Sequence, residues 1–334
     1  MFRVDLPVEL VEGLERACAG VPERQLAASV DRLISRYRDP RPAAAPILGS
    51  AADVTAYAAY RMPATWAAVR SVLGRFRELV PGFQPRSFLD IGGGTGAALW
   101  ASAEVFPSLT EAVVLDQVDE ALQLGRRLAG GAAAAAVRSA VWRQGTVTGL
   151  GTPGRADLVA VSYVLSELSE TDQAAVVGRA AEAAEVVTVV EPGTPDGHHR
   201  ILAARDELMT AGLTIVAPCP HRMPCPLAEG ADWCHFSARI NRTSLHRRLK
   251  GGELGHEDEK FSYVVASRTP HRQAPGRILR HPLKRKGLVT LQVCTADEGV
   301  VPTLVSKRQG ETYRRARDVQ WGDAWPPGPA AASS

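Results

Sequence analysis

The feature that most constrains the fold of this sequence is an alternation of short apolar runs and helical patterns that begins at Arg86. Stretches whose apolar residues recur at helical spacing separate runs typical of buried strands: SFLDIG, EAVVLD, ADLVAVSYVL and EVVTVVEPG. Such alternation indicates βαβ units, because parallel strands need a crossover connection, usually a helix. The pattern therefore predicts an α/β fold with a parallel sheet, and ligands are expected at the carboxyl ends of the strands.

The segments before and after this alternation predict how the chain is divided into regions. Before it, Leu26, Val30, Leu33 and Tyr37 lie at helical spacing. After it, the chain is rich in Pro, Cys and His up to about Phe236, and strand-like runs then return at KFSYVVAS, LVTLQVC and VVPTLVS. We expect a helical cap over 1–80, a Rossmann-like core over 81–200, a cysteine-containing basic region with the last core strands over 201–325, and a disordered tail over 326–334.

Composition excludes several classes of protein. The 334 residues are 45% hydrophobic and 22% charged, which fits neither wholesale disorder nor a fibrous repeat. No window approaches the roughly 20 consecutive apolar residues of a membrane span, so we expect no membrane crossing. The first residues, MFRVDLPVELVEGLERA, mix acidic and apolar positions, unlike a secretory signal or a transit peptide, which predicts a cytoplasmic location. The sequence indicates no oligomeric state.

A glycine-rich turn follows the first predicted strand. In DIGGGTG, Asp90, Gly92, Gly94 and Gly96 lie between a strand and a helix, where glycine permits a tight turn and close approach to a ligand. The loop also satisfies a degenerate dinucleotide pattern through Ala97, which leaves NAD open. S-adenosylmethionine is favoured because the Asp90 carboxylate is placed to hold an ammonium group, and because Gly96 comes one residue early for a dinucleotide.

The carboxyl ends of the next strands supply further candidates. Asp116 ends EAVVLD, where an acidic side chain can accept both ribose hydroxyls, although a simple turn residue is the alternative. Ser162 and Tyr163 follow at the next strand end, and neither is an obvious base. Glu167 can be interpreted as a helix residue that has no chemical role. The sequence has no Asn/Asp-Pro-Pro-aromatic motif at this strand end for amine methylation, so the catalytic residues stay unassigned.

Four of the five cysteines lie in the C-terminal part of the chain. Cys219, Cys225 and Cys234 are separated by five and eight residues, and Cys294 ends LVTLQVC. Prolines on both sides of Cys219 and Cys225 fix φ and remove amide donors, so that the loop can wrap an inorganic centre. Zinc sites usually use closer cysteine pairs, whereas iron–sulfur ligation accepts wider spacing. The spacing favours a [4Fe–4S] cluster over zinc, with unligated core thiols as a third interpretation.

Neighbouring residues leave other roles open. The dipeptides Pro218-Cys219 and Pro224-Cys225 match the nucleophile of some cytosine-C5 RNA methyltransferases, but a nucleophile needs no three companion thiols. His221 and His235 are alternative ligands, outer-shell donors or surface histidines. The fifth cysteine, Cys18, lies on the apolar side of a predicted helix and is expected in the core.

Positive charge is concentrated near the C-terminus. Residues 239–318 hold 18 Lys or Arg against 8 Asp or Glu, although the whole chain carries only +3. This imbalance suits a polyanion such as nucleic acid, or a solvated basic face that balances an acidic body. Spacings of three to four residues predict one basic helix face for phosphate contacts, formed by Arg239, Arg242, His246, Arg247, Arg248 and Lys250.

Taken together, these motifs resemble one family. DIGGGTG, YVLSEL, VEPGTPDG, the block CPHRMPCPL…DWCHFSARINRTSLHRRLKGGELGHEDEKFSYVVASR and the final KRKGLVTLQVCT are similar to the methyltransferase-like family of mitochondrial small-ribosomal-subunit assembly proteins and their bacterial counterparts. The resemblance runs from about Tyr60 through Trp325. It implies a class I S-adenosylmethionine-dependent methyltransferase (Rossmann-like) sheet, association with the small ribosomal subunit or its rRNA, and a [4Fe–4S] cluster. The implied cluster ligands are Cys219, Cys225, Cys234 and Cys294, and the implied cofactor loop is Asp90, Gly92, Gly94 and Gly96.

Two functional hypotheses follow from the residues and the resemblance. In the first, the chain is an enzyme that transfers the methyl group of S-adenosylmethionine to an rRNA base, mainly by positioning the two reactants. In the second, the fold and the cluster form a rigid RNA-docking surface during small-subunit assembly, without catalysis.

Overall fold

Four helices precede the first strand of the computed structural model, which describes residues 5–38, 50–146, 154–250, 254–271 and 273–326. They are α1 (Val8–Ala19), α2 (Glu23–Arg38), α3 (Ala51–Tyr60) and α4 (Met62–Leu79). Leu26, Val30 and Leu33 are buried on α2 as predicted, and Cys18 is buried on α1. The side chain of Tyr37 and most of the expected tail, residues 327–334, lie outside the described residues. Within these ranges, no helix is long and apolar enough to cross a membrane.

The central sheet confirms the predicted fold class. Strands β1 to β5 are parallel, and β8 runs antiparallel to β5, β6 and β7. The order β3-β2-β1-β4-β5-β8-β6, with a single antiparallel strand inserted before the last, is that of class I S-adenosylmethionine-dependent methyltransferases. The strands are β1 (Ser87–Ile91), β2 (Glu111–Asp116), β3 (Val141–Gln144), β4 (Ala156–Ser162), β5 (Ala184–Pro192), β6 (Thr214–Ala217), β7 (Phe236–Asn241) and β8 (His256–Ser267).

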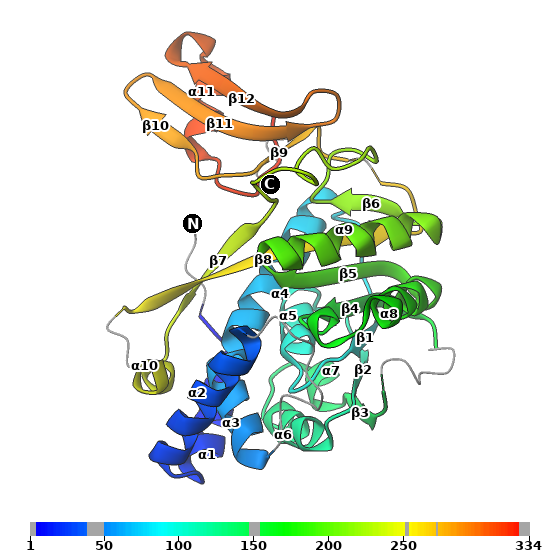
Figure 1. Ribbon diagram of the computed structural model, residues 1–334, viewed down its shortest axis with the longest axis vertical. Helices are drawn as coiled ribbons and strands as arrows, with labels where there is room; N and C mark the ends of the chain where they lie inside the picture. Colours follow the sequence, from blue (N-terminus) through cyan, green and yellow to red (C-terminus); the bar gives the residue numbers. More distant parts are fainter. Residues whose placement is uncertain (1–4, 39–49, 147–153, 251–253, 272, 327–334) are drawn as a thin grey trace.

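Helices cover both faces of this sheet (Figure 1). Alternate strand residues enter two separate cores: Phe88 and Leu158 pack in the core that contains α4 and α5, whereas Leu89 and Val159 pack with α8 and α9. This double burial explains why the strands read as continuous apolar runs. The connecting helices are α5 (Ala97–Val105), α6 (Asp119–Ala129), α7 (Ala135–Arg138), the short 3₁₀ helix η1 (Leu165–Glu167), α8 (Glu170–Ala183), α9 (Pro195–Thr210) and α10 (Ser244–Lys250).

A second, antiparallel sheet follows β8 and lies beyond the end of the main body near β6 (Figure 1). It has its own apolar core, in which Val289, Leu291 and Val293 of β11 pack with Ala316 of α11. Of the three late strand-like runs, KFSYVVAS therefore belongs to the main sheet, and the other two belong to this second sheet. Its elements are β9 (Gly276–Ile278), β10 (Leu283–Arg285), β11 (Leu288–Thr295), β12 (Gly299–Ser306), the 3₁₀ helix η2 (Lys307–Gln309) and α11 (Glu311–Asp318).

The indole of Trp142, on β3, packs beneath the glycine-rich loop. A Cβ atom added to Gly96 would lie 2.7 Å from this ring, and one added to Gly125 of α6 would lie 2.3 Å from it. Both glycines therefore let the indole lie against the backbone. Trp142 supports the turn that the sequence pattern identified, yet nothing in the local pattern around it indicates that role.

We predict that Gly125→Ala lowers the free energy of unfolding by about 1–3 kcal/mol, because the new methyl group overpacks against Trp142. The matched control is Gly74→Ala in α4, where an added Cβ meets no atom within 4 Å. That change should raise stability by about 0.5–1 kcal/mol, since alanine is the better helix former. Urea unfolding of both variants measures the difference, and equal effects would contradict the packing of Trp142 described here.

Candidate cofactor loop and thiol cavity

The glycine-rich loop turns sharply at the carboxyl end of β1. Gly92, Gly94 and Gly96 have φ values of 69°, 53° and 86°, in the left-handed region that favours glycine. The amides of Gly92 and Gly93 donate to the Leu115 carbonyl at 2.9 and 3.0 Å. These bonds tie the loop to β2.

Two acidic residues predicted from the sequence meet at this loop. Asp116 accepts hydrogen bonds from the Gly94 amide and the Val118 amide, each at 2.8 Å. Asp90 is fully buried, and neither of its carboxylate oxygens has a hydrogen-bond partner among the described residues. Burial and the nearby Asp116 raise the pKa of Asp90 to about 8, with the Leu99 amide acting in the opposite direction. The site thus holds a buried carboxyl group that is paired with no cationic side chain in the described part of the chain.

Glu167, in η1, adds a third acidic group. Burial, followed by the charges of Asp116 and Glu191, raises the pKa of Glu167 to about 7. Glu191 itself is held in place, because it accepts from the Leu165 amide at 3.1 Å and from Arg200 Nε at 2.7 Å. Glu167 therefore has the pKa of a group that can exchange a proton near neutral pH.

Tyr163 lies directly after β4, at the predicted strand end, with a φ of 58°. Its hydroxyl donates to Glu259 Oε1 at 3.0 Å, and Arg61 donates to both oxygens of Glu259 at 3.0 and 3.2 Å. Burial raises the pKa of the Tyr163 phenol well above its usual value. This partly buried triad joins the junction of α3 and α4 to the end of β4 and to β8, and it keeps Tyr163 neutral. Sequence analysis did not find Arg61 and Glu259, because they lie far from Tyr163 along the chain.

The four C-terminal cysteines line one cavity, as the sequence pattern requires. Cys219 follows β6, Cys225 and Cys234 lie in the loop before β7, and Cys294 comes from β11 of the second sheet. The cavity has a volume of about 30 Å³, close to the share of one water molecule in the liquid. Among the described residues, no three His, Cys, Asp or Glu side chains are spaced to hold a single metal ion.

Two histidines lie against these thiols. Cys294 Sγ is 3.6 Å from His221 Nε2, and Cys225 Sγ is 4.0 Å from His198 Nε2. His221 Nδ1 lies 3.1 Å from the Met223 carbonyl, which can only accept, so this nitrogen carries the proton and Nε2 is left to face Cys294. His235, the other predicted alternative, instead donates Nδ1 to the Trp233 carbonyl at 3.1 Å.

Burial and positive charge act in opposite directions on these thiols. Burial raises the pKa of all four, that of Cys294 to about 12. Arg277 is 2% exposed and donates to the carbonyls of Pro218 and Gly322, and it has no carboxylate partner in the part of the chain that the structure describes. A buried cation of this kind favours negative charge nearby. Arg205, which is also buried, and Arg277 lower the pKa of Cys219, but burial outweighs both charges and the pKa of each thiol stays above its usual value.

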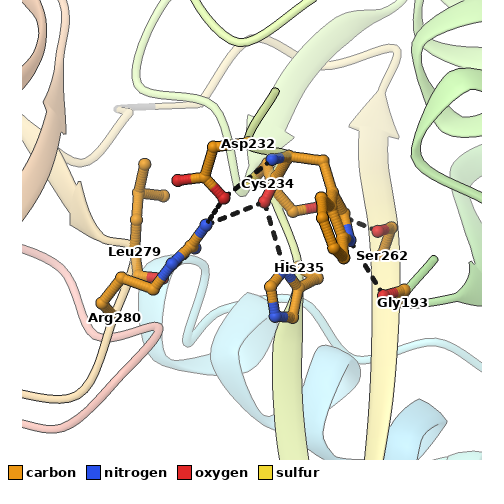
Figure 2. A network of polar contacts seen from close by, with 8 residues as sticks. Gly193, Asp232, Cys234, His235, Ser262, Leu279 and Arg280 are labelled. Carbon is orange, nitrogen blue, oxygen red and sulfur yellow. Dashed lines mark hydrogen bonds and ion pairs between the residues drawn. The ribbon is translucent and has the colours of Figure 1, made fainter. Parts of the chain in front are cut away.

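A polar network fixes the chain on either side of Cys234 (Figure 2). The Cys234 carbonyl accepts from Ser262 Oγ at 2.8 Å, and the indole of the preceding Trp233 donates to the Gly193 carbonyl at 2.9 Å. Arg280 pairs with Asp232 and also donates to the Trp233 carbonyl. These bonds link the cysteine loop to β8, to the start of α9 and to the second sheet.

The prediction of one basic helix face is wrong for Arg239 and Arg242, because neither residue lies on a helix. Arg239 lies on β7 and pairs with Asp258 of β8 through two bonds of 2.6 Å. Arg242 and His246 lie 3.4 and 3.3 Å from Glu257. The acidic run of β8 thus pairs with Arg239, which lies on the adjacent strand β7, and with Arg242, which follows that strand. Only Arg247 and Arg248 lie exposed on α10; the Lys250 side chain is outside the described residues.

We predict that Asp90 contributes a loss of stability as the pH rises from about 4 to about 8, and that Asp90→Asn removes this contribution. The folded pKa of Asp90 is raised to about 8 from a usual 3.8, so the unfolded chain loses its proton first and ionisation favours unfolding over this range. Urea unfolding at several pH values measures the effect, with Asp297→Asn, an exposed turn residue, as the control. Equal slopes for wild type and Asp90→Asn would contradict the buried state of Asp90.

Comparisons with known proteins identify the family to which the chain is similar. Residues 51–326 match the family model for the mitochondrial small ribosomal subunit protein Rsm22. The human mitochondrial ribosome assembly protein METTL17 is 30% identical over 289 residues, which are 81% of this chain and 62% of METTL17. The Rsm22-cox11 tandem protein 2 of Schizosaccharomyces pombe is 27% identical over 183 residues, which are 42% of this chain and 24% of that protein.

The chain thus spans less than two thirds of the length of these curated relatives. Among solved structures, an O-methyltransferase family protein from Burkholderia thailandensis is 13% identical, with 78% of this chain and 71% of that chain covered and a TM-score of 0.44. Because the family model covers most of the sequence and includes both the glycine-rich loop and the four clustered cysteines, the chain belongs to the Rsm22 family.

Proposed function

We propose that this chain is an assembly factor that binds the small ribosomal subunit through its rRNA. Membership in the Rsm22 family carries this proposal, and METTL17, named as a ribosome assembly protein, supports it. The basic residues of the C-terminal part support an RNA partner independently. The named relatives are mitochondrial proteins. We propose that this chain lies in the same compartment as the ribosome that it helps to assemble. The cytoplasmic location stays a prediction.

We propose S-adenosylmethionine as the ligand of the glycine-rich loop. The unpartnered Asp90 carboxylate fits a ligand with positive charge, and S-adenosylmethionine carries both an ammonium and a sulfonium group. Asp116 stands at the end of β2, where acidic side chains accept ribose hydroxyls. Of the three left-handed glycines, Gly94 leaves room for a ligand beside the backbone, because a Cβ atom added there would meet only Asp116 Oδ2, at 3.9 Å. When bound, this cofactor supplies an activated methyl group.

Methyl transfer to rRNA is the second candidate function, and Glu167 is the observation that favours it. With a pKa of about 7, this carboxyl group could accept a proton from an acceptor base near neutral pH. Tyr163 is a poor base, because its hydroxyl is committed to Glu259. The binding function requires no such group and depends only on the docking surface.

The deciding experiment supplies the purified chain with radiolabelled S-adenosylmethionine and immature small subunits. We predict stable co-sedimentation with the subunits. Label in the rRNA that disappears in Glu167→Gln would establish the enzyme, whereas tight binding without label would establish the binding factor. Failure to co-sediment with immature or mature small subunits would contradict the proposed function in both forms.

We also propose that Cys219, Cys225, Cys234 and Cys294 hold a [4Fe–4S] cluster. Zinc, the alternative, usually uses cysteine pairs closer in sequence than these, whereas iron–sulfur ligation accepts wider spacing and often draws one cysteine from a distant segment, as Cys294 is here. A cluster of several atoms holds its cysteines further apart. Since the cavity is small, loading would move the loop between Cys219 and Cys234 outward. Arg277 would offset the negative charge of the thiolates.

We predict that protein purified without oxygen is brown and contains iron and acid-labile sulfide in comparable amounts. Cys225→Ser should bleach the colour and destabilise the C-terminal region, because metal binding contributes to folding there. Cys18→Ser, which changes a buried thiol on α1, should leave the colour unchanged. Stoichiometric zinc without sulfide would refute the cluster.

The exposed residues Arg247 and Arg248 on α10 remain proposed RNA contacts. Reversing both charges to Glu should weaken binding to rRNA fragments and reduce the slope of log affinity against log salt by about 0.7–0.9 per lost phosphate contact. Fluorescence anisotropy over a salt series measures this slope. An unchanged slope would remove α10 from the RNA interface.

A further inference from the structure

A second cavity, of about 270 Å³, lies between the main body and the second sheet. Arg75 of α4 and Ser237 of β7 form its wall on the body. The opposite wall comes from the loop and strand around β10 and from the segment after α11. No Asp or Glu side chain is among its described lining residues, which are Arg75, Ser237, His281, Pro282, Lys284, Val319, Gln320 and Trp321.

Two hydrogen-bond donors at this cavity lack acceptors. Trp321 is 8% exposed, and its indole Nε1 has no partner among the described residues. Arg75 Nε is also buried without a partner, although the other guanidinium nitrogens donate to the Asp323 carboxylate at 3.1 Å and to the Trp321 carbonyl at 2.9 Å. Both nitrogen atoms are covered by the surrounding protein, so they make this wall of the cavity electropositive without contacting a ligand directly, and a ligand with oxygen atoms is favoured over a cation.

Aromatic rings stand beside these donors. The ring of His281 lies 4.9 Å from that of Trp321 in an edge-to-face arrangement, and the guanidinium of Arg280 lies 5.9 Å from the indole centre. His281 is exposed, so one of its faces is available for stacking. Positive charge continues outward from the cavity, since residues 277–286 contain five Lys or Arg and no acidic residue. Lys284, Arg285 and Lys286 are exposed.

We infer that this cavity receives one unpaired nucleotide of the RNA partner, whose backbone continues along Lys284–Lys286. The inference rests on the proposed function and adds the binding mode. A flat base stacks on His281, the electropositive wall formed by Arg75 and Trp321 favours base or phosphate oxygens, and the lysines meet the neighbouring phosphates. The volume of about 270 Å³ lies just below the roughly 300 Å³ at which small-ligand sites begin, so the cavity has room for a single base and not for a duplex. An acidic peptide would satisfy the lysines but would leave the stacking surface unused.

The test uses the full chain and a fluorescein-labelled single-stranded RNA of about ten nucleotides, within the range that single-strand sites cover. His281→Ala and Lys284→Ala each change an exposed side chain, and Arg127→Ala removes an exposed charge from α6 as the control. Loss of one stacked base is worth about 1–3 kcal/mol, or about 5- to 150-fold in affinity. We expect at least a fivefold loss for His281→Ala, a smaller loss for Lys284→Ala, and none for Arg127→Ala.

Three controls separate the possible outcomes. The same oligonucleotide without bases should bind at least fivefold more weakly than the intact RNA, and photocrosslinks from 4-thiouridine should map to the segments around His281 and Trp321. Equal affinity for the intact and abasic RNA, or no effect of His281→Ala, would overturn the nucleotide site. Competition by polyglutamate at lower concentration than by RNA would assign the cavity to an acidic protein and also overturn it. Co-sedimentation of the same variants with small subunits reports the proposed function separately.

Discussion

The convergence of four cysteine side chains on one buried cavity is the constraint on which the organisation of this protein depends. The thiols come from the loop between β6 and β7 and from β11 of a separate sheet, so their cavity lies where the main body meets the C-terminal sheet. Burial raises the pKa of each thiol, whereas the buried guanidinium of Arg277 favours thiolates. A bound inorganic centre would overcome the effect of burial on the thiol pKa values, because metal coordination deprotonates thiols and draws their loops together.

Strand β8 makes contacts on both sides: to Tyr163, which follows β4 near the glycine-rich loop, and to the cysteine loop. Glu259 of this strand holds Tyr163 beside the loop, and three residues later Ser262 holds the carbonyl of Cys234. Arg280 and Asp232 then connect the cysteine loop to the second sheet. The ring of Trp321, at the proposed nucleotide site, contacts His235, the neighbour of Cys234. One continuous set of packed groups therefore links the cofactor loop, the thiol cavity and the proposed RNA site.

The sequence predicted the parallel sheet, the glycine-rich loop and the grouping of the cysteines, because each leaves a local pattern: apolar runs, glycine spacing, and cysteines flanked by proline. It misassigned Arg239 and Arg242 to a helix, because helical spacing of charges also occurs by chance in a strand followed by a turn. The acidic run that neutralises them lies on β8, and no local pattern indicates that pairing. Trp142, Arg61, Arg277 and Arg75 escaped notice for the same reason, since their roles come from contacts made across the fold.

The most direct test of this account is X-ray absorption of the anaerobically purified chain at the iron and zinc edges. The account predicts an iron signal with sulfur neighbours and with iron–iron scattering at short range, both lost when Cys234 or Cys294 is changed to Ser. A zinc signal with sulfur neighbours, or no bound metal at either edge, would contradict it. Either contradictory result would leave the four clustered thiols as ordinary packing residues or as the ligands of a different centre.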